Sequence, residues 1–168
     1  MSRPVYVYAL AVVGLFAALG AGLGLAANFI LGFFIEQFVE PGADPLDSTQ
    51  VGVMFLTSIF TIYAMGPMTA GIAGVGVGQA LPDRRAVASI VAGAGSFIGF
   101  YLFVGLGLFF TFTVLAEYGS GGGGGGGSPL DPSSLLTLML QVSLPVGLVG
   151  LSAAYLTSKI TQRAASAQ

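Results

Sequence analysis

Long runs without charge alternate with short polar segments along the whole chain. The uncharged runs cover residues 4–35, 48–82, 86–116 and 132–158. Each run is longer than the roughly 20 apolar residues that cross a hydrocarbon core about 30 Å thick. Because a backbone in hydrocarbon must satisfy its own hydrogen bonds, each run is predicted to be an α-helix.

The predicted fold is an all-α integral membrane protein, in which four transmembrane helices form one bundle and residues 1–168 make a single membrane domain. The expected spans are about 5–35, 51–81, 86–116 and 133–159. The first run is too long for the apolar region of a signal peptide, which has about 7–15 residues. We therefore expect that run to remain in the protein as a span.

The composition indicates the same class of protein. Hydrophobic residues make up 55% of the chain and charged residues only 7%, and the mean hydropathy is +0.91. Soluble domains carry about 25% charged residues, so a chain this apolar needs lipid to cover its surface. The lipid bilayer is therefore its first expected partner.

The chain lacks residue types that several kinds of chemistry require. The chain has no cysteine and no histidine, which removes disulfides, thiolate ligands and the commonest general base. No charged residue falls in the middle of a run, whereas proton relays, ion-coupled pumps and voltage sensors need one. The few basic residues give no nucleic-acid signature. We expect no enzyme activity, no metal, no cofactor and no nucleic-acid partner.

The signs of the charges divide the polar segments into two sets. Basic residues occur only at the N-terminus, between the second and third runs, and at the C-terminus: Arg3, Arg84, Arg85, Lys159 and Arg163. The other two connections hold the acidic residues except Asp83: Glu36, Glu40, Asp44, Asp47, Glu117 and Asp131. Because basic residues concentrate in cytoplasmic loops, the predicted topology is N-in and C-in across the cytoplasmic membrane.

The longer of the two outer connections is expected to be a flexible glycine-rich loop at 119–130. It contains an unbroken run of glycines from Gly121 to Gly127. A phosphate-binding loop is the alternative, but the stretch lacks the Gly-Lys-Ser/Thr ending and precedes no strand–helix unit. Glycines have maximal backbone freedom and no side chains to pack, so the composition favours a linker.

Small residues recur at helical spacing in every run. In lipid, helices associate through close backbone approach and interhelical hydrogen bonds rather than through hydrophobicity. The rows could pack within the chain, seat a second copy or a partner subunit, or line a pore. The predicted helix-packing residues are Ala17, Ala21, Gly24, Gly74, Gly78, Gly95, Gly99, Gly147 and Gly150.

Four polar side chains are expected at similar depth below the outer helix ends, namely Asn28, Ser58, Thr111 and Gln141. At about 1.5 Å per residue, Asn28 and Gln141 would lie some 11 Å deep. This polar layer has two interpretations. It is either an interhelical clasp worth about 0.5–2 kcal/mol per hydrogen bond, or a site for a solute or lipid headgroup open to the outside.

Proline interrupts the second and fourth runs, at Gly66-Pro67 and at Pro145. Each proline removes a backbone hydrogen bond and crowds the preceding turn, so a kink or break is predicted. Discontinuous helices expose carbonyl groups that coordinate ions in transporters. Proline is also common in ordinary membrane helices, which leaves a purely structural interpretation open.

Two functional hypotheses follow from these patterns. The first is a non-enzymatic structural or accessory role, in which the small-residue faces pack in a homo-oligomer or against other membrane subunits. The second is a passive channel or small-solute transport unit that uses the polar layer and the kinked second and fourth helices.

Overall fold

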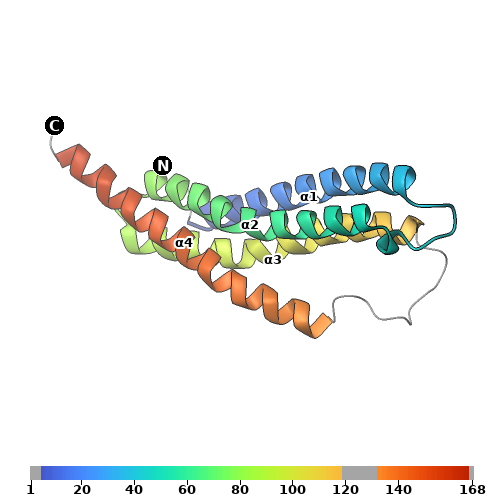
Figure 1. Ribbon diagram of the computed structural model, residues 1–168. Helices are drawn as coiled ribbons and strands as arrows, with labels where there is room; N and C mark the ends of the chain where they lie inside the picture. Colours follow the sequence, from blue (N-terminus) through green and yellow to red (C-terminus); the bar gives the residue numbers. More distant parts are fainter. Residues whose placement is uncertain (1–4, 119–131, 167–168) are drawn as a thin grey trace.

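The computed structural model describes residues 5–118 and 132–166, and at 132–136 and 138 it describes the backbone alone. Its elements are α1 (Val5–Phe38), the short 3-10 helix η1 (Pro45–Asp47), α2 (Thr49–Ala80), α3 (Arg85–Tyr118) and α4 (Pro132–Ser166) (Figure 1). The predicted all-α four-helix bundle is confirmed, and 4 helices are long and apolar enough to span a membrane. Arg3 and the predicted loop at 119–130 lie outside the described residues.

The helices are longer than the predicted spans. They contain between 32 and 35 residues, or about 48–53 Å at 1.5 Å per residue. The expectation that Glu36 opens the first loop is wrong, because α1 continues to Phe38 and the chain turns only at Pro41-Gly42. Gly42 has φ of 88°, a conformation that favours glycine. The fourth helix is also longer than its predicted span, because α4 continues past Lys159 to Ser166.

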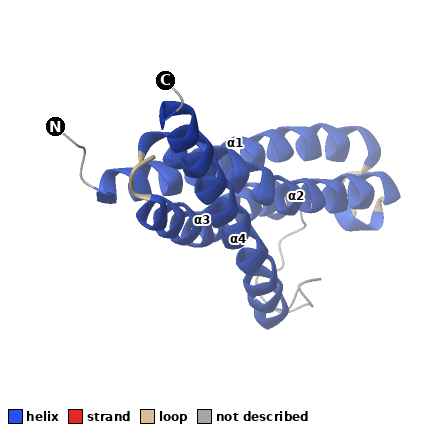
Figure 2. Cartoon of the chain, turned by 90° about the vertical axis from the view of Figure 1, so that its left-hand side faces the viewer, coloured by secondary structure: helices blue, strands red, loops and turns tan. Residues whose placement is uncertain are grey.

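The four helices are not equivalent in their packing. α1 packs chiefly against α3, and α4 packs against α2 and α3. Figure 1 shows α1, α2 and α3 running side by side, while α4 crosses them at an angle. Figure 2 shows from a second direction that the N-terminal end of α4 leaves the bundle. The C-terminal half of α4, together with the buried residues Ser143 and Val146, therefore holds this helix in the fold.

Hydrogen bonds fix the C-terminal half of α4 at the α2–α3 connection. Arg85 Nε donates to Gln162 Oε1 at 2.7 Å, and Gln162 Nε2 donates to the Pro82 carbonyl oxygen at 2.6 Å. This end of the bundle is called the basic end, after its residues Arg84, Arg85, Lys159 and Arg163. The α1–α2 connection lies at the opposite end (Figure 1), called the acidic end, after Glu36, Glu40, Asp44, Asp47 and Glu117.

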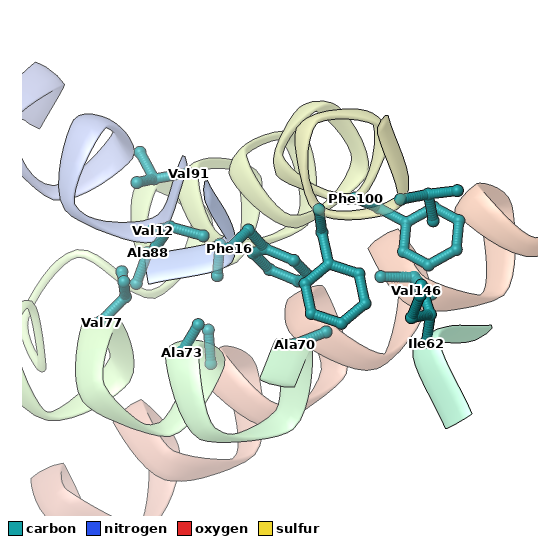
Figure 3. Close-up of a cluster of buried hydrophobic side chains, with 14 of the residues drawn as sticks. Val12, Phe16, Ile62, Ala70, Ala73, Val77, Ala88, Val91, Phe100 and Val146 are labelled. Carbon is teal, nitrogen blue, oxygen red and sulfur yellow. The ribbon is translucent and has the colours of Figure 1, made fainter. Parts of the chain in front are cut away.

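The main core lies between all four helices and is built around aromatic rings. Phe16, Phe100 and Phe103 are fully buried. Phe103 of α3 meets Phe16 of α1 edge-to-face at 6.0 Å between ring centroids, and stacks on Phe100 at 6.3 Å. Figure 3 shows Phe100 beside Val146 of α4 and Ile62 of α2. The rings of α3 therefore connect the other three helices.

Both proline-containing helices run unbroken past the proline. α2 is one helix around Pro67, and α4 is one helix around Pro145, so the predicted break does not occur at either position. A proline can be carried by a membrane helix because neighbouring groups and local adjustment satisfy the freed backbone. A bend at either proline stays a prediction.

Candidate functional site

A close helix contact joins α2 to the C-terminal half of α4. A Cβ atom added at Gly74 would collide with the Gly150 carbonyl oxygen and would lie 2.8 Å from Ala153 Cβ. One added at Gly78 would lie 2.6 Å from the Ala154 carbonyl oxygen. The two backbones touch here, with small residues on both sides of the contact.

A serine hydroxyl strengthens the same contact. Ser158 Oγ lies 3.1 Å from the Gly78 carbonyl oxygen and 2.9 Å from the Ala154 carbonyl oxygen of its own helix. It is fully buried, so its single proton serves these two acceptors away from water. This hydroxyl therefore adds a polar contact between α2 and α4 beside the close approach at Gly78.

The other predicted packing glycines also face neighbouring helices. An added Cβ at Gly95 would lie 3.1 Å from Val12, and one at Gly99 would lie 2.9 Å from Phe16. Gly147 and Gly150 of α4 face Gly93, Phe97 and Ser96 of α3 in the same way, and Gly24 of α1 faces Gly107. Ala17 and Ala21 are half-buried on α1.

Sequence reasoning missed Gly20, which forms a close pair on α1 with the predicted Gly24. A Cβ added at Gly20 would lie 2.5 Å from the Phe103 carbonyl oxygen, and one added at Gly24 would lie 2.8 Å from the Gly107 carbonyl oxygen. Gly20 and Gly24 are four positions apart, which is the spacing of the right-handed membrane helix pair. The Gly20–Gly24 spacing is visible in the sequence, but the predicted row of Ala17, Ala21 and Gly24 did not include Gly20.

The predicted polar layer does not form one hydrogen-bonded group. Asn28 Nδ2 donates to the Phe110 carbonyl oxygen at 2.8 Å and to Thr113 Oγ1 at 3.1 Å, both on α3. Ser58 and Thr111 donate to carbonyl oxygens of their own helices. Gln141 is exposed on α4. Asn28 alone of the four therefore makes an interhelical bond within the described part of the chain.

This difference gives a direct prediction about Asn28. Replacing it in Asn28→Ala removes two donor contacts between α1 and α3, so the free energy of unfolding should fall by about 1 kcal/mol. The measurement is an unfolding titration in mixed micelles, followed by the helical circular dichroism signal.

The matched control is Gln141→Ala, which truncates an exposed amide of similar chemistry on another helix. Its effect on the unfolding of the single chain should stay within about 0.5 kcal/mol. Equal losses in the two variants would contradict the assignment of the interhelical bond to Asn28.

Two hydroxyl groups lie buried without a hydrogen-bond partner among the described residues, at Tyr63 and Ser96. The Tyr63 ring packs edge-to-face on Phe100 at 6.0 Å. Ser96 Oγ is pressed against α4, since a Cβ added at Gly150 would lie 2.6 Å from it. The Ser96 hydroxyl therefore sits within a tight contact between α3 and α4.

Open space occurs instead between α1 and α2. One pocket of about 160 Å³, the acidic-end groove, is lined by Leu23, Ala26, Ala27, Ile30, Met54, Thr57, Ser58, Thr61 and Ile62. A second of about 260 Å³, the basic-end groove, is lined by Tyr8, Ala11, Val12, Leu15, Ile72, Ala73, Gly76, Val77 and Ala80. The hydroxyls of Thr57, Ser58 and Thr61 donate to their own helix. Both grooves therefore present apolar surface.

In the described part of the chain, the acidic end holds no cluster suited to a metal ion. Among residues 5–118 and 132–166, no three acidic side chains gather in a metal-binding group. Glu36 instead accepts a hydrogen bond of 2.8 Å from the Tyr118 hydroxyl, which ties the end of α1 to the end of α3. Asp44 accepts a bond of 2.9 Å from the Leu46 backbone N–H and caps η1. These acidic groups act on local structure.

Taken together, the described residues present close helix contacts, side-chain hydrogen bonds between helices and two apolar grooves in a four-span membrane protein. Comparison with protein-family models, with curated proteins and with solved structures gives no match for this chain.

Proposed function

We propose that the chain is a non-enzymatic structural or accessory subunit that packs against a second copy or against other membrane subunits. The observation that carries this proposal is the outward face of α1. Gly14, Ala18, Gly22 and Ala26 are exposed there at every fourth position. A Cβ added at Gly14 or Gly22 would meet nothing within 4 Å. Such a row lets a second helix approach closely in lipid.

Gln141 supports the same role through a different kind of contact. Its side chain is exposed on an apolar helix and makes no hydrogen bond to another described residue. A polar group that faces hydrocarbon carries a desolvation cost unless it finds a partner. An amide or hydroxyl from a neighbouring subunit would satisfy it, as interhelical hydrogen bonds do in other membrane bundles.

The distribution of charge supports an orientation in the membrane. The basic end carries Arg84, Arg85, Lys159 and Arg163, and the acidic end carries Glu36, Glu40, Asp44, Asp47 and Glu117. Positive charge near span ends concentrates on the cytoplasmic side. We place the basic end, and with it both termini, in the cytoplasm of a cell whose cytoplasmic membrane holds the protein.

The role is tested by the size of the purified protein in mild detergent. The wild type should run as an oligomer or with co-purifying subunits, and Gly22→Leu should shift it to a smaller species with unchanged helix content. The matched control is Gly105→Leu on α3, where an added Cβ also meets nothing within 4 Å. A wild type that is monomeric and alone, or equal shifts in both variants, would contradict the proposal.

The channel hypothesis makes a separate prediction, which the same material can test. Wild-type protein reconstituted in liposomes should pass no ion or small solute if its role is packing alone. Solute efflux that is lost in Asn28→Ala combined with Gln141→Ala, with the fold intact, would instead favour a channel.

A further inference from the structure

The basic-end groove is an apolar cleft that opens sideways from the bundle. Tyr8, Ala11 and Leu15 of α1 form one wall, and Ile72, Gly76 and Ala80 of α2 form the other. Small residues keep it open, since a Cβ added at Gly76 would meet nothing within 4 Å. Both walls belong to helices that are apolar enough to span a membrane. Hydrocarbon is therefore the medium at its mouth.

An exposed cationic side chain, Arg84, follows the α2 wall of this groove in the chain. α2 ends at Ala80, and the next residues form a tight turn in which the Arg84 N–H donates to the Leu81 carbonyl oxygen at 3.2 Å. Such a turn keeps its first and last Cα atoms within about 7 Å. The Arg84 side chain is exposed and makes no ion pair with a described residue. It is therefore within reach of the groove mouth.

The two charged residues beside Arg84 differ from it: Arg85 is engaged in a hydrogen bond, and Asp83 is negative. Arg85 Nε donates to Gln162 Oε1 at 2.7 Å, which directs that side chain toward α4. Asp83 is exposed beside Arg84 and offsets one of the two arginine charges. The turn as a whole stays positive, and Arg84 is its unengaged cation.

We propose that the basic-end groove binds one acyl chain of an anionic glycerophospholipid whose phosphate is held by Arg84. A guanidinium group matches the geometry of a phosphate with two parallel hydrogen bonds. Basic positions between membrane helices attract anionic headgroups. The groove supplies apolar contact for the chain, and the turn supplies the charge at the level where a headgroup lies. This inference stands apart from the accessory role, because it needs only the spanning helices and the turn.

The acidic-end groove is an internal comparison on the same two helices. It is also apolar and open, and neither lining includes a charged side chain. No basic residue follows the walls of the acidic-end groove in the chain, and its hydroxyls donate to their own helix. It should accept hydrocarbon without regard to the headgroup. Selectivity for anionic lipid should therefore depend on the basic-end groove.

The test compares spin-labelled phosphatidylglycerol with spin-labelled phosphatidylcholine, each added to phosphatidylcholine vesicles that contain the full-length protein. The wild type should immobilise phosphatidylglycerol preferentially, and Arg84→Gln should lower that preference about fivefold. The control Arg163→Gln, which removes an exposed cation from α4 at the same end, should leave it unchanged. Equal losses in the two variants would overturn the proposal.

The groove itself is tested by filling it. Gly76→Leu should lower the immobilised fraction of both lipids, whereas Gly105→Leu, which adds the same side chain on α3, should not. If Gly76→Leu does not fold, Ala11→Leu fills the groove from the opposite wall, where Ala11 is exposed. An unchanged immobilised fraction would overturn the proposal. A change only in oligomeric state would also overturn it, because a second copy would then occupy the groove.

Discussion

Gly74→Leu should detach α4 from α2 and lower the free energy of unfolding by roughly 3 kcal/mol. Overpacking of a filled interior costs about 1–3 kcal/mol, and the upper end applies because the obstacle is backbone. An added Cβ already collides with the Gly150 carbonyl oxygen and lies 2.8 Å from Ala153 Cβ. The unfolding titration in mixed micelles that tests Asn28 also measures this loss.

The matched control lies two residues away on the same helix. Gly76→Leu adds the same side chain at a position where a Cβ meets nothing within 4 Å. Its unfolding free energy should stay within about 0.5 kcal/mol of the wild type. If both substitutions destabilise the protein equally, the close α2–α4 contact is wrong.

Phe103→Ala should be the most costly truncation in the core. Phe→Ala costs about 3–5 kcal/mol in water-soluble proteins, where a transfer term and a cavity term add together. In lipid, the separated helix leaves its side chain in hydrocarbon, so little of the transfer term remains. The cavity term remains because Phe103 is fully buried against Phe16 and Phe100. We expect a loss of about 2 kcal/mol in the same titration.

Phe109→Ala provides the comparison for Phe103. It makes the same substitution on the same helix, at a side chain that is 60% exposed. Because that ring faces lipid in the folded and the separated helix alike, its removal should change the unfolding free energy by no more than about 0.5 kcal/mol. Equal losses would mean that the ring stack of α3 does not hold the bundle together.

The four helices could be predicted from the sequence because hydrocarbon imposes one rule on every span. An uncharged run longer than a bilayer core has to be a helix, and each run is one. The helix ends were harder to predict, because a helix need not stop where hydrocarbon does. Glu36 illustrates this, since charge alone places it in the loop, whereas no turn signal precedes Pro41-Gly42.

The small-residue rows were also informative, because a glycine at a fourth position has a clear use in lipid. Gly74 and Gly78 of α2 face the backbone of Gly150 and Ala154 on α4. The rows do not say which helix each will meet. That choice depends on rotation about each axis and on the fit of large side chains such as Phe16 and Phe103.

The polar layer shows what depth along a helix cannot decide. Asn28 and Gln141 lie at comparable distances from their helix ends, yet Asn28 bonds to α3 and Gln141 faces outward. The direction in which a side chain points around the helix axis changes by about 100° per residue. Depth alone therefore does not tell whether a residue faces a neighbouring helix or lipid. Ser58 and Thr111 need no interhelical partner, because a hydroxyl in a helix can donate to a carbonyl oxygen of the preceding turn.

The length of the helices ties this protein to the thickness of its membrane. Rods of about 50 Å exceed an average hydrocarbon core of about 30 Å by some 20 Å. Tilting, local thickening of the surrounding lipid, or apolar surface left among the headgroups must absorb that difference, at a cost that grows with each ångström of mismatch. Rings such as Phe33 and Phe38, exposed near the acidic end of α1, would be covered best by longer acyl chains. The protein should therefore gather where the bilayer is thickest.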